Sequence, residues 1–460
     1  MEDIPMKMTT PILDFLHAYV TKHPIRLHMP GHKGVLLTGC ESYDITEVAG
    51  ADSLYEAEGI IRESEHNASL LFGCPTYYST EGSSQCIRAM LYLVTLHARA
   101  RGLRRPLILA GRNAHKTFLS AVALLDLDVE WLYPPYEHGY LSCPVGQCGL
   151  TDALERLESE GRLPAAVYLT SPDYLGNTLD IEELSAVCRR FGVLLVVDNA
   201  HGAYLRFLPE SKHPMDLGAD LCCDSAHKTL PVLTGGAYLH VGTHLPLNLK
   251  AQVKQALALF GSTSPSYLIL QSLDMANAVL ASKKYVTDLS KTVKRVEACR
   301  NRLAMAGFAF PCNDDPLKLT LSPRAYGYTG VDLAEHLREN GIECEFADPD
   351  YLVLMATPST TDRDLQRLTD VLLALPRREG LLDCPPPMVC PRRVMTTREA
   401  LFSPSEVLPV EDCIGRVLAA ATVGCPPAVP IVACGEVIDE ACLDCFRYYG
   451  IEYCSVVLDV

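Results

Sequence analysis

An uninterrupted apolar run at residues 192–197 places the strongest constraint on the fold. The run reads Gly-Val-Leu-Leu-Val-Val and is followed directly by Asp198. Such a run is typical of a strand buried on both faces of a parallel sheet. Further strand-like runs lie at 106–110, 165–170 and 219–224, and helical stretches between them include 84–98 and 181–190. This alternation predicts an α/β fold with a doubly wound, mostly parallel sheet.

Asp198 would lie at the carboxyl end of its strand, where ligands bind in open α/β sheets. The next strand leads into Ser225-Ala226-His227-Lys228-Thr229. Pyridoxal 5'-phosphate (PLP) needs both residue types, since a lysine forms the Schiff base and a carboxylate keeps the pyridine nitrogen protonated. Taken singly, a lysine such as Lys228 is more often a solvated loop residue, and an aspartate such as Asp198 is more often a helix cap. Their order, with His201 and His227 beside them, predicts a PLP site.

Two further segments suit this cofactor. Gly82 is followed by Ser83 and Ser84 at the start of a helical stretch, where backbone N–H groups and hydroxyls can bind a phosphate. A plain helix cap is the alternative. His115 follows another strand and is positioned to stack on the ring, although a lone histidine is more often a surface or core residue. The small side chain of Ala200 would let the ring lie flat.

The remainder of the chain divides at changes in pattern. We expect an N-terminal segment at 1–63, a large PLP-binding domain at 64–295, a small α+β domain at 296–383 and a C-terminal domain at 384–460. In the small domain, strands are predicted at 317–321, 343–346 and 352–355, and helices at 330–340 and 361–374. The proline run at 385–387 is typical of a stiff linker.

Composition excludes several partners. The formal net charge of −16 argues against nucleic acid and anionic membrane surfaces. The sequence has no apolar run of membrane-spanning length and no secretory leader pattern, so a cytoplasmic location is expected. The 19 cysteines are scattered, which favours reduced thiols packed as small core residues. Cys442 and Cys445 form the only close pair with metal spacing, and no metal site is predicted.

Several motifs together resemble the Orn/Lys/Arg decarboxylase family, the bacterial group of fold-type-I PLP enzymes. They are His28-Met29-Pro30-Gly31-His32-Lys33-Gly34, the region from Asn113 to Lys116, Asp198-Asn199-Ala200-His201-Gly202-Ala203, and the segment from Ser225 to Pro231. Residues 411–421, 426–430 and 435–436 resemble the family's C-terminal domain. The likeness covers essentially the whole chain and is to the short forms without an N-terminal wing domain.

The resemblance implies a role for each residue of the site. Lys228 is the implied Schiff-base lysine, Asp198 the partner of the pyridine nitrogen, and His115 the residue stacked on the ring. The implied phosphate ligands are Ser83, Ser84, Ser225 and His227, with Ala200 against the other ring face and His201 beside them. The implied reaction is decarboxylation of arginine, lysine or ornithine by a homodimer or larger homo-oligomer.

The sequence departs from the family pattern at identifiable positions. Asn199 replaces the usual glutamate after the pyridine-binding aspartate, and Gly235 replaces the usual glutamine. Two alternatives therefore stay open: a different fold-type-I reaction, such as transamination or a lyase reaction, and a silent relative that binds PLP. A carboxylate should recognise the distal cation of the substrate, and Glu343 and Glu345 are candidates for it.

Overall fold

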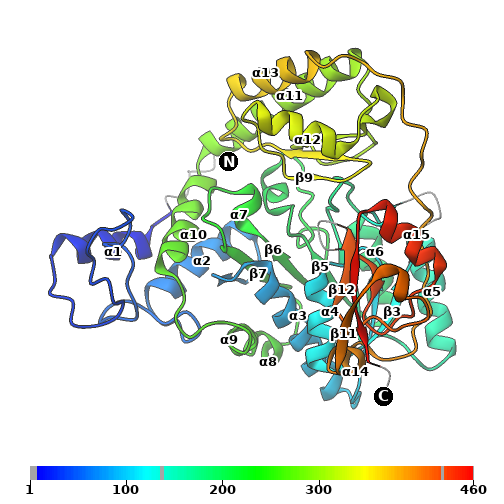
Figure 1. Cartoon of the computed structure of the whole chain (residues 1–460). Helices are drawn as coiled ribbons and strands as arrows, with labels where there is room; N and C mark the ends of the chain where they lie inside the picture. Colours follow the sequence, from blue (N-terminus) through cyan, green and yellow to red (C-terminus); the bar gives the residue numbers. More distant parts are fainter. Residues whose placement is uncertain (1–7, 135–138, 426–428, 459–460) are drawn as a thin grey trace. The chain divides into compact units, whose positions relative to one another are not determined.

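The structure is a computed structural model that describes residues 8–134, 139–425 and 429–458 (Figure 1). The chain divides into two compact units, each made of segments that are distant in sequence. The first unit comprises Met1–Arg104 and Ile181–Asp288, and the second comprises Arg105–Asp180 and Leu289–Val460. Helix α11, Lys283–Met305, contains the second crossing into the second unit.

Four strands of the first unit lie in the order β1-β7-β6-β5. β5 and β6 are parallel, whereas β7 is antiparallel to both β6 and β1. The strands are β1 Thr76–Ser79, β5 Leu194–Asp198, β6 Leu221–Asp224 and β7 Ala237–Val241. The helices are α1 Pro11–Thr21, α2 Ile60–Phe72, α3 Gly82–Ala100, α6 Ile181–Phe191, η1 Ala203–Phe207, α7 Ala226–Thr229, α8 Leu247–Lys250, α9 Val253–Ala258 and α10 Tyr267–Leu280.

The predicted strand at 192–197 is present as β5, and every residue from Leu194 to Asp198 is buried. A run without charges can form such a strand because both of its faces lie against apolar groups. Helix α3 follows β1 and packs against β7 and β6 (Figure 1). It is longer than the predicted stretch at 84–98 because it begins at Gly82, directly after the loop that was expected to bind phosphate.

The second unit holds a three-stranded parallel group, β4-β2-β3, and a small antiparallel sheet, β8-β10-β9. The strands are β2 Leu107–Gly111, β3 Asp128–Leu132, β4 Ala166–Thr170, β8 Lys318–Leu321, β9 Phe346–Ala347, β10 Leu352–Met355, β11 Ser405–Pro409, β12 Thr422–Cys425, β13 Val429–Ala433 and β14 Tyr453–Val457. The helices are α4 Lys116–Leu125, α5 Gln147–Ser159, η2 Pro323–Tyr326, α12 Gly330–Glu339, α13 Asp362–Leu373, α14 Thr397–Leu401, η3 Val410–Asp412 and α15 Glu440–Tyr448.

The small sheet corrects one strand prediction. Residues 343–346 were expected to form a strand, but only Phe346 and Ala347 pair with β10. The side chains of 342–345 alternate between half-buried and exposed, which resembles strand periodicity, while their backbone separates from β10. Glu345 N makes the last bond of this segment to the strand, to Val353 O at 3.0 Å.

A buried ion pair joins the C-terminal segment to the parallel group of the second unit. Arg112 follows β2, and its Nη2 lies 2.9 Å from Oε2 of Glu436. The two side chains are 0% and 1% exposed. The same nitrogen donates to Ile431 O at 3.1 Å, and the guanidinium lies 4.9 Å from the centre of the Trp131 ring. Burial raises the pKa of Glu436 while Arg112 opposes this, so the pair depends on both charges.

None of the described helices is both long enough and apolar enough to cross a membrane.

Candidate active site

Lys228 lies on the short helix α7, directly after strand β6. Its Nζ is 2.8 Å from Nε2 of His201, which is buried at 4% exposure. Lys228 itself is half-buried. An amine held against an imidazole can exchange a proton with it, because the ordinary pKa of histidine lies near neutrality. The structure thus brings together two of the residues that the sequence predicted.

Asp198 ends strand β5, and the strand register pairs it with Cys223 of β6. The carboxylate is 3% exposed and accepts a hydrogen bond from Ala200 N at 3.2 Å. The thiol of Cys223 also points at it, at 3.7 Å. Burial raises the pKa of Cys223 well above its usual value, so this thiol stays protonated and can donate. Asp198 and the segment that carries Lys228 therefore leave adjacent parallel strands.

The expected phosphate ligands meet at the N-terminus of α3. Oγ of Ser225 donates to Oγ of Ser83 at 2.8 Å. The ring of His227 lies beside Gly82, where an added Cβ would be 3.9 Å from its Cε1 atom. Ser84 follows Ser83 in the first helical turn. Backbone N–H groups of a first helical turn, with hydroxyls beside them, form a favourable anion site.

The carboxylate of Glu81, at the N-terminus of α3, points away from the first helical turn. Glu81 is the N-cap of α3, but its carboxylate accepts from Ser262 N, and within the described part of the chain it makes no capping bond. A carboxylate directed at the first turn would occupy the donors that an anion needs. The position of Glu81 is thus compatible with a phosphate at this helix end.

Gly235 packs against the phosphate loop. Its φ is +98°, and an added Cβ would lie 2.8 Å from the carbonyl oxygen of Thr80. Gly82 N donates to Gly235 O at 2.7 Å, which holds the two loops together. The departure from glutamine thus has a local reason, since only glycine combines this backbone conformation with this close approach.

His115 lies in the second unit, at the N-terminus of α4. Its Nδ1 accepts from Thr117 N at 3.2 Å and lies 3.0 Å from Thr117 Oγ1. The ring therefore caps its own helix, and this bond fixes its orientation. The stacking role of His115 stays a prediction.

A buried hydrogen-bonded group centred on Asp224 adjoins this site and was not predicted from the sequence. Asp224, the last residue of β6, accepts from Asn199 Nδ2 through Oδ1 at 2.6 Å. Nε2 of His213 and Nε2 of His240 each lie 3.0 Å from its Oδ2. The two histidines lie 11 and 16 residues from Asp224, on either side of it, and meet it because β7 pairs with β6 and the segment before β6 folds back. The one available signal was an acid at the end of the apolar run 219–224.

His213, Asp224 and His240 are the one group of potential metal ligands found in the described part of the chain. Met215 N donates to Nδ1 of His213 at 3.3 Å, so the ring proton lies on Nε2 and points at Asp224. A zinc ligand needs that nitrogen without its proton. Hydrogen bonding, rather than metal binding, accounts for this arrangement.

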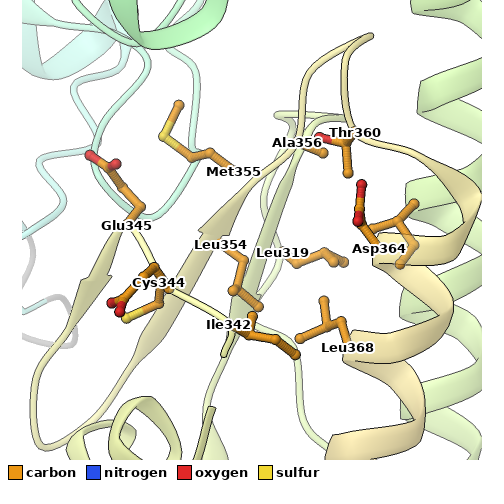
Figure 2. A pocket seen from close by; sticks show the side chains of 12 residues that line it. Leu319, Ile342, Cys344, Glu345, Leu354, Met355, Ala356, Thr360, Asp364 and Leu368 are labelled. Carbon is orange, nitrogen blue, oxygen red and sulfur yellow. The ribbon is translucent and has the colours of Figure 1, made fainter. Parts of the chain in front are cut away.

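The two candidate acids for the substrate cation lie in the second unit. Both Glu343 and Glu345 are exposed, and Glu343 lies 3.6 Å from Arg338. They line a cavity of about 280 Å³ beside the small sheet. In Figure 2 the carboxylates of Glu345 and Asp364 lie on either side of a group of apolar side chains that includes Leu354 and Leu368. The cavity is therefore apolar at its centre and acidic at its edge.

A third acid of the same segment, Asp348, is buried and closes the turn between β9 and β10. Its Oδ1 accepts from Asp350 N at 2.8 Å and from Tyr351 N at 2.6 Å. Burial raises the pKa of Asp348 to about 7. The folded protein therefore holds a proton that the unfolded chain releases near pH 4. Stability from this group is present at low pH and is lost as pH rises through 7.

We expect Asp348→Asn to raise the melting temperature at pH 8 and to raise it less than half as much at pH 5, where the unfolded chain has only begun to gain from releasing the proton. Asparagine keeps the acceptor oxygen and has no charge to bury. The difference in unfolding free energy at pH 8 should be on the order of 4 kcal/mol. Thermal unfolding of both proteins at the two pH values measures it. Asp152→Asn, at an exposed position of α5, is the control, and an equal shift at both pH values would contradict the assignment to Asp348.

The sequence profile of the family described as "Orn/Lys/Arg decarboxylase, major domain" matches residues 10–312. The chain belongs to the Orn/Lys/Arg decarboxylase family. A curated relative, the arginine decarboxylase of Bacillus subtilis (strain 168), is 28% identical and aligns with 94% of this chain and 91% of its own. The constitutive lysine decarboxylase of Escherichia coli (strain K12) is 22% identical, over 63% of this chain and 43% of its own. Membership identifies the protein as a decarboxylase of basic amino acids.

Solved structures of the family have the same fold. The lysine decarboxylase of Francisella novicida superposes with a TM-score of 0.80 at 17% identity, over 99% of this chain and 82% of that one. The constitutive lysine decarboxylase of E. coli gives 0.77 at 19% identity, over 98% and 82%. The predicted α/β fold of PLP fold type I is thus confirmed.

The family implies PLP as cofactor, and the residues of the first unit suit it. An amine at Lys228, a buried carboxylate at Asp198 and paired hydroxyls at the start of α3 match the imine, pyridine and phosphate ends of that molecule. Each group leaves the carboxyl end of a strand or begins the helix that follows one.

Proposed function

We propose that this member of the family decarboxylates arginine to agmatine, a polyamine precursor, with PLP bound at Lys228. The observation that carries the proposal is the contact between Lys228 Nζ and His201 Nε2, beside the strand that ends in the buried Asp198. PLP, when bound, supplies an electron-accepting ring that stabilises the negative charge left at Cα as the carboxylate departs. The remaining roles belong to the chain itself.

Each site residue has a defined task in this proposal. Asp198 holds a proton on the pyridine nitrogen, because a buried carboxylate favours a cationic partner. Ser83, Ser84, Ser225 and His227 bind the phosphate at the start of α3. Ala200 and His115 pack on the two faces of the ring.

In this proposal, Lys228 and His201 are the residues that transfer protons during the reaction. Lys228 attaches the cofactor and returns a proton at the end of the cycle. His201, in contact with its amine, accepts or supplies that proton. The short distance supports a direct transfer between the two side chains.

The relatives favour arginine as substrate. Among the relatives that match over more than nine tenths of both chains is the arginine decarboxylase of B. subtilis, whereas the lysine decarboxylase of E. coli matches a smaller part of this chain. Glu343 and Glu345 stay candidates for the carboxylate that binds the guanidinium, and a bidentate contact would suit it.

We also propose a homodimer or larger homo-oligomer in the cytoplasm. Several large apolar side chains of the N-terminal segment are exposed, namely Ile25, Leu27, Met29, Val35, Leu36 and Leu37. Exposed apolar groups of this size commonly contact a partner, here a second copy of the chain. The described cysteines are free thiols, as in a reducing compartment. We also propose that the chain is organised into the segments 1–63, 64–295, 296–383 and 384–460, as its sequence pattern predicts.

Incubation of the PLP-loaded protein with arginine, lysine and ornithine separately, with mass spectrometry of the amines, tests the function. We expect agmatine as the main product, with kcat/KM for arginine at least about tenfold above that for the other two. Lysine or ornithine as best substrate would overturn the choice of arginine. A keto acid product would instead indicate transamination, and bound PLP without any product a silent relative.

A further inference from the structure

Asp224 is connected to the two charged residues of the candidate site, to Lys228 along the chain and to Asp198 through the neighbouring Asn199. It directly precedes Ser225, and Lys228 follows on α7. Its hydrogen-bond partner Asn199 directly follows Asp198. The bond between these two side chains therefore links the end of β5 to the end of β6, where the two charged groups of the site begin. Nothing in the proposed chemistry assigns a task to either residue.

Two histidines extend this link across the sheet. His240 belongs to β7, and its Nδ1 lies 2.9 Å from Thr76 Oγ1 on β1. His213 comes from the segment before β6 and donates to the same carboxylate oxygen. The group and its contact on β1 thus span β1, β7, β6 and β5, which are consecutive in the sheet.

Burial affects the pKa values of Asp224 and His240 differently. Burial alone raises the pKa of Asp224, but the interactions with His213 and His240 outweigh it, so the pKa lies below its usual value. Burial lowers the pKa of His240. The group is therefore an ionised carboxylate held by the Asn199 amide and the two histidine rings, with the Cys222 thiol 3.9 Å from Oδ1, and its four members are 0% exposed. A buried carboxylate is stable only with such complete hydrogen bonding.

Asn199 provides evidence that its bond to Asp224 matters. Its Oδ1 is buried and has no partner within the described part of the chain. An orphaned buried acceptor costs roughly 1–3 kcal/mol. The amide must nevertheless keep this orientation, because a carbonyl oxygen facing Asp224 would be repelled. The same argument explains the departure from glutamate, since a second carboxylate here would face an ionised one.

We propose that Asn199, His213, Asp224 and His240, named here the Asp224 anchor, position Asp198 relative to Lys228 and thereby set the affinity for PLP. These are positioning residues, which act through their chain neighbours. The inference rests on the proposed function, since it concerns the site for PLP. It also means that asparagine at 199 is matched to this chain's own Asp224 and is compatible with full activity.

Three variants test the anchor. Asn199→Ala removes only the link to β5, Asn199→Asp opposes two carboxylates, and the double variant Asn199→Asp with Asp224→Asn exchanges the two groups. Each is purified, stripped of PLP and titrated with PLP while visible absorbance is followed. The pH dependence of the absorbance of the bound cofactor is recorded as well, since a purely structural role would not change it. Melting temperatures of the PLP-free proteins report folding.

We expect both single variants to bind PLP at least about tenfold more weakly and to shift the pH midpoint of the absorbance change. The double variant should regain affinity to within about threefold, because the carboxylate and the amide again face each other. Folded variants with unchanged affinity and midpoint would overturn the inference. If the double variant, which changes Asp224, is recovered only as aggregate, the PLP affinity and pH midpoint of Asn199→Ala decide whether the inference holds. Wild-type protein that binds no PLP would overturn the proposed function, which distinguishes the two failures.

Discussion

Replacing Lys228 with alanine is expected to lower kcat/KM by roughly 10⁴-fold or more. The variant loses the amine that attaches PLP and the group that returns the proton, while His201 loses its contact at 2.8 Å. The visible absorbance of bound PLP should shift accordingly. Borohydride reduction of the wild type followed by peptide mass spectrometry should find the cofactor on the peptide that contains Lys228. The same treatment of the variant should leave that peptide unmodified.

Two controls separate chemistry from folding in this experiment. Lys212→Ala removes an exposed lysine of the same unit and should keep full activity. Adding a small primary amine to Lys228→Ala should restore part of the lost rate, because the missing function is an amine rather than a shape. Substantial activity in unsupplemented Lys228→Ala, or labelling of another lysine, would contradict the assignment.

Replacing Asp198 with asparagine should lower kcat on the order of 10³-fold with little change in KM. The amide keeps the shape and can still accept from Ala200 N, but it cannot keep the pyridine nitrogen protonated. PLP should remain attached at Lys228, so the loss should appear in kcat rather than in cofactor content. Steady-state kinetics at saturating PLP, with absorbance spectra of the same samples, measure both.

Asp220→Asn is the matched control for this variant. Asp220 is another buried acid of the same sheet, directly before β6, and its Oδ2 accepts from Leu195 N at 2.6 Å. Its replacement should affect stability and leave the spectrum of bound PLP unchanged. Equal losses of kcat in the two variants would show that general disturbance of the sheet, rather than the charge on Asp198, explains the effect.

The candidate site could be located on the fold from the sequence because each of its signals involves only a few consecutive residues. Each key residue ends an apolar run or lies in the first turn of a helix, as Asp198 does at the end of β5 and Ser83 does in α3. Those patterns depend on a few consecutive residues, so they can be recognised without knowledge of the tertiary structure.

The small sheet shows the limit of such patterns. Alternating exposure at 342–345 imitates a strand, yet backbone pairing with β10 begins only near Phe346.

The Asp224 anchor lay beyond this kind of prediction. Its histidines meet Asp224 only because β7 runs antiparallel to β6 and because the segment before β6 folds back. The sequence shows Asn199 only as a departure from the family pattern, because its partner Asp224 lies 25 residues away. Contacts of this type, such as that of Asn199 with Asp224, become visible only when the strand register is known.

The ion pair between Arg112 and Glu436 bears on how the protein emerges from the ribosome. Strand β2 is synthesised long before β13 and Glu436, although all three belong to the second unit. Until residue 436 is available, burial of Arg112 beside Trp131 would leave a guanidinium without its counter-charge. A nascent chain therefore gains little from closing this part of the core early. Synthesis must therefore reach residue 436 before this part of the second unit can bury Arg112 with its counter-charge in place.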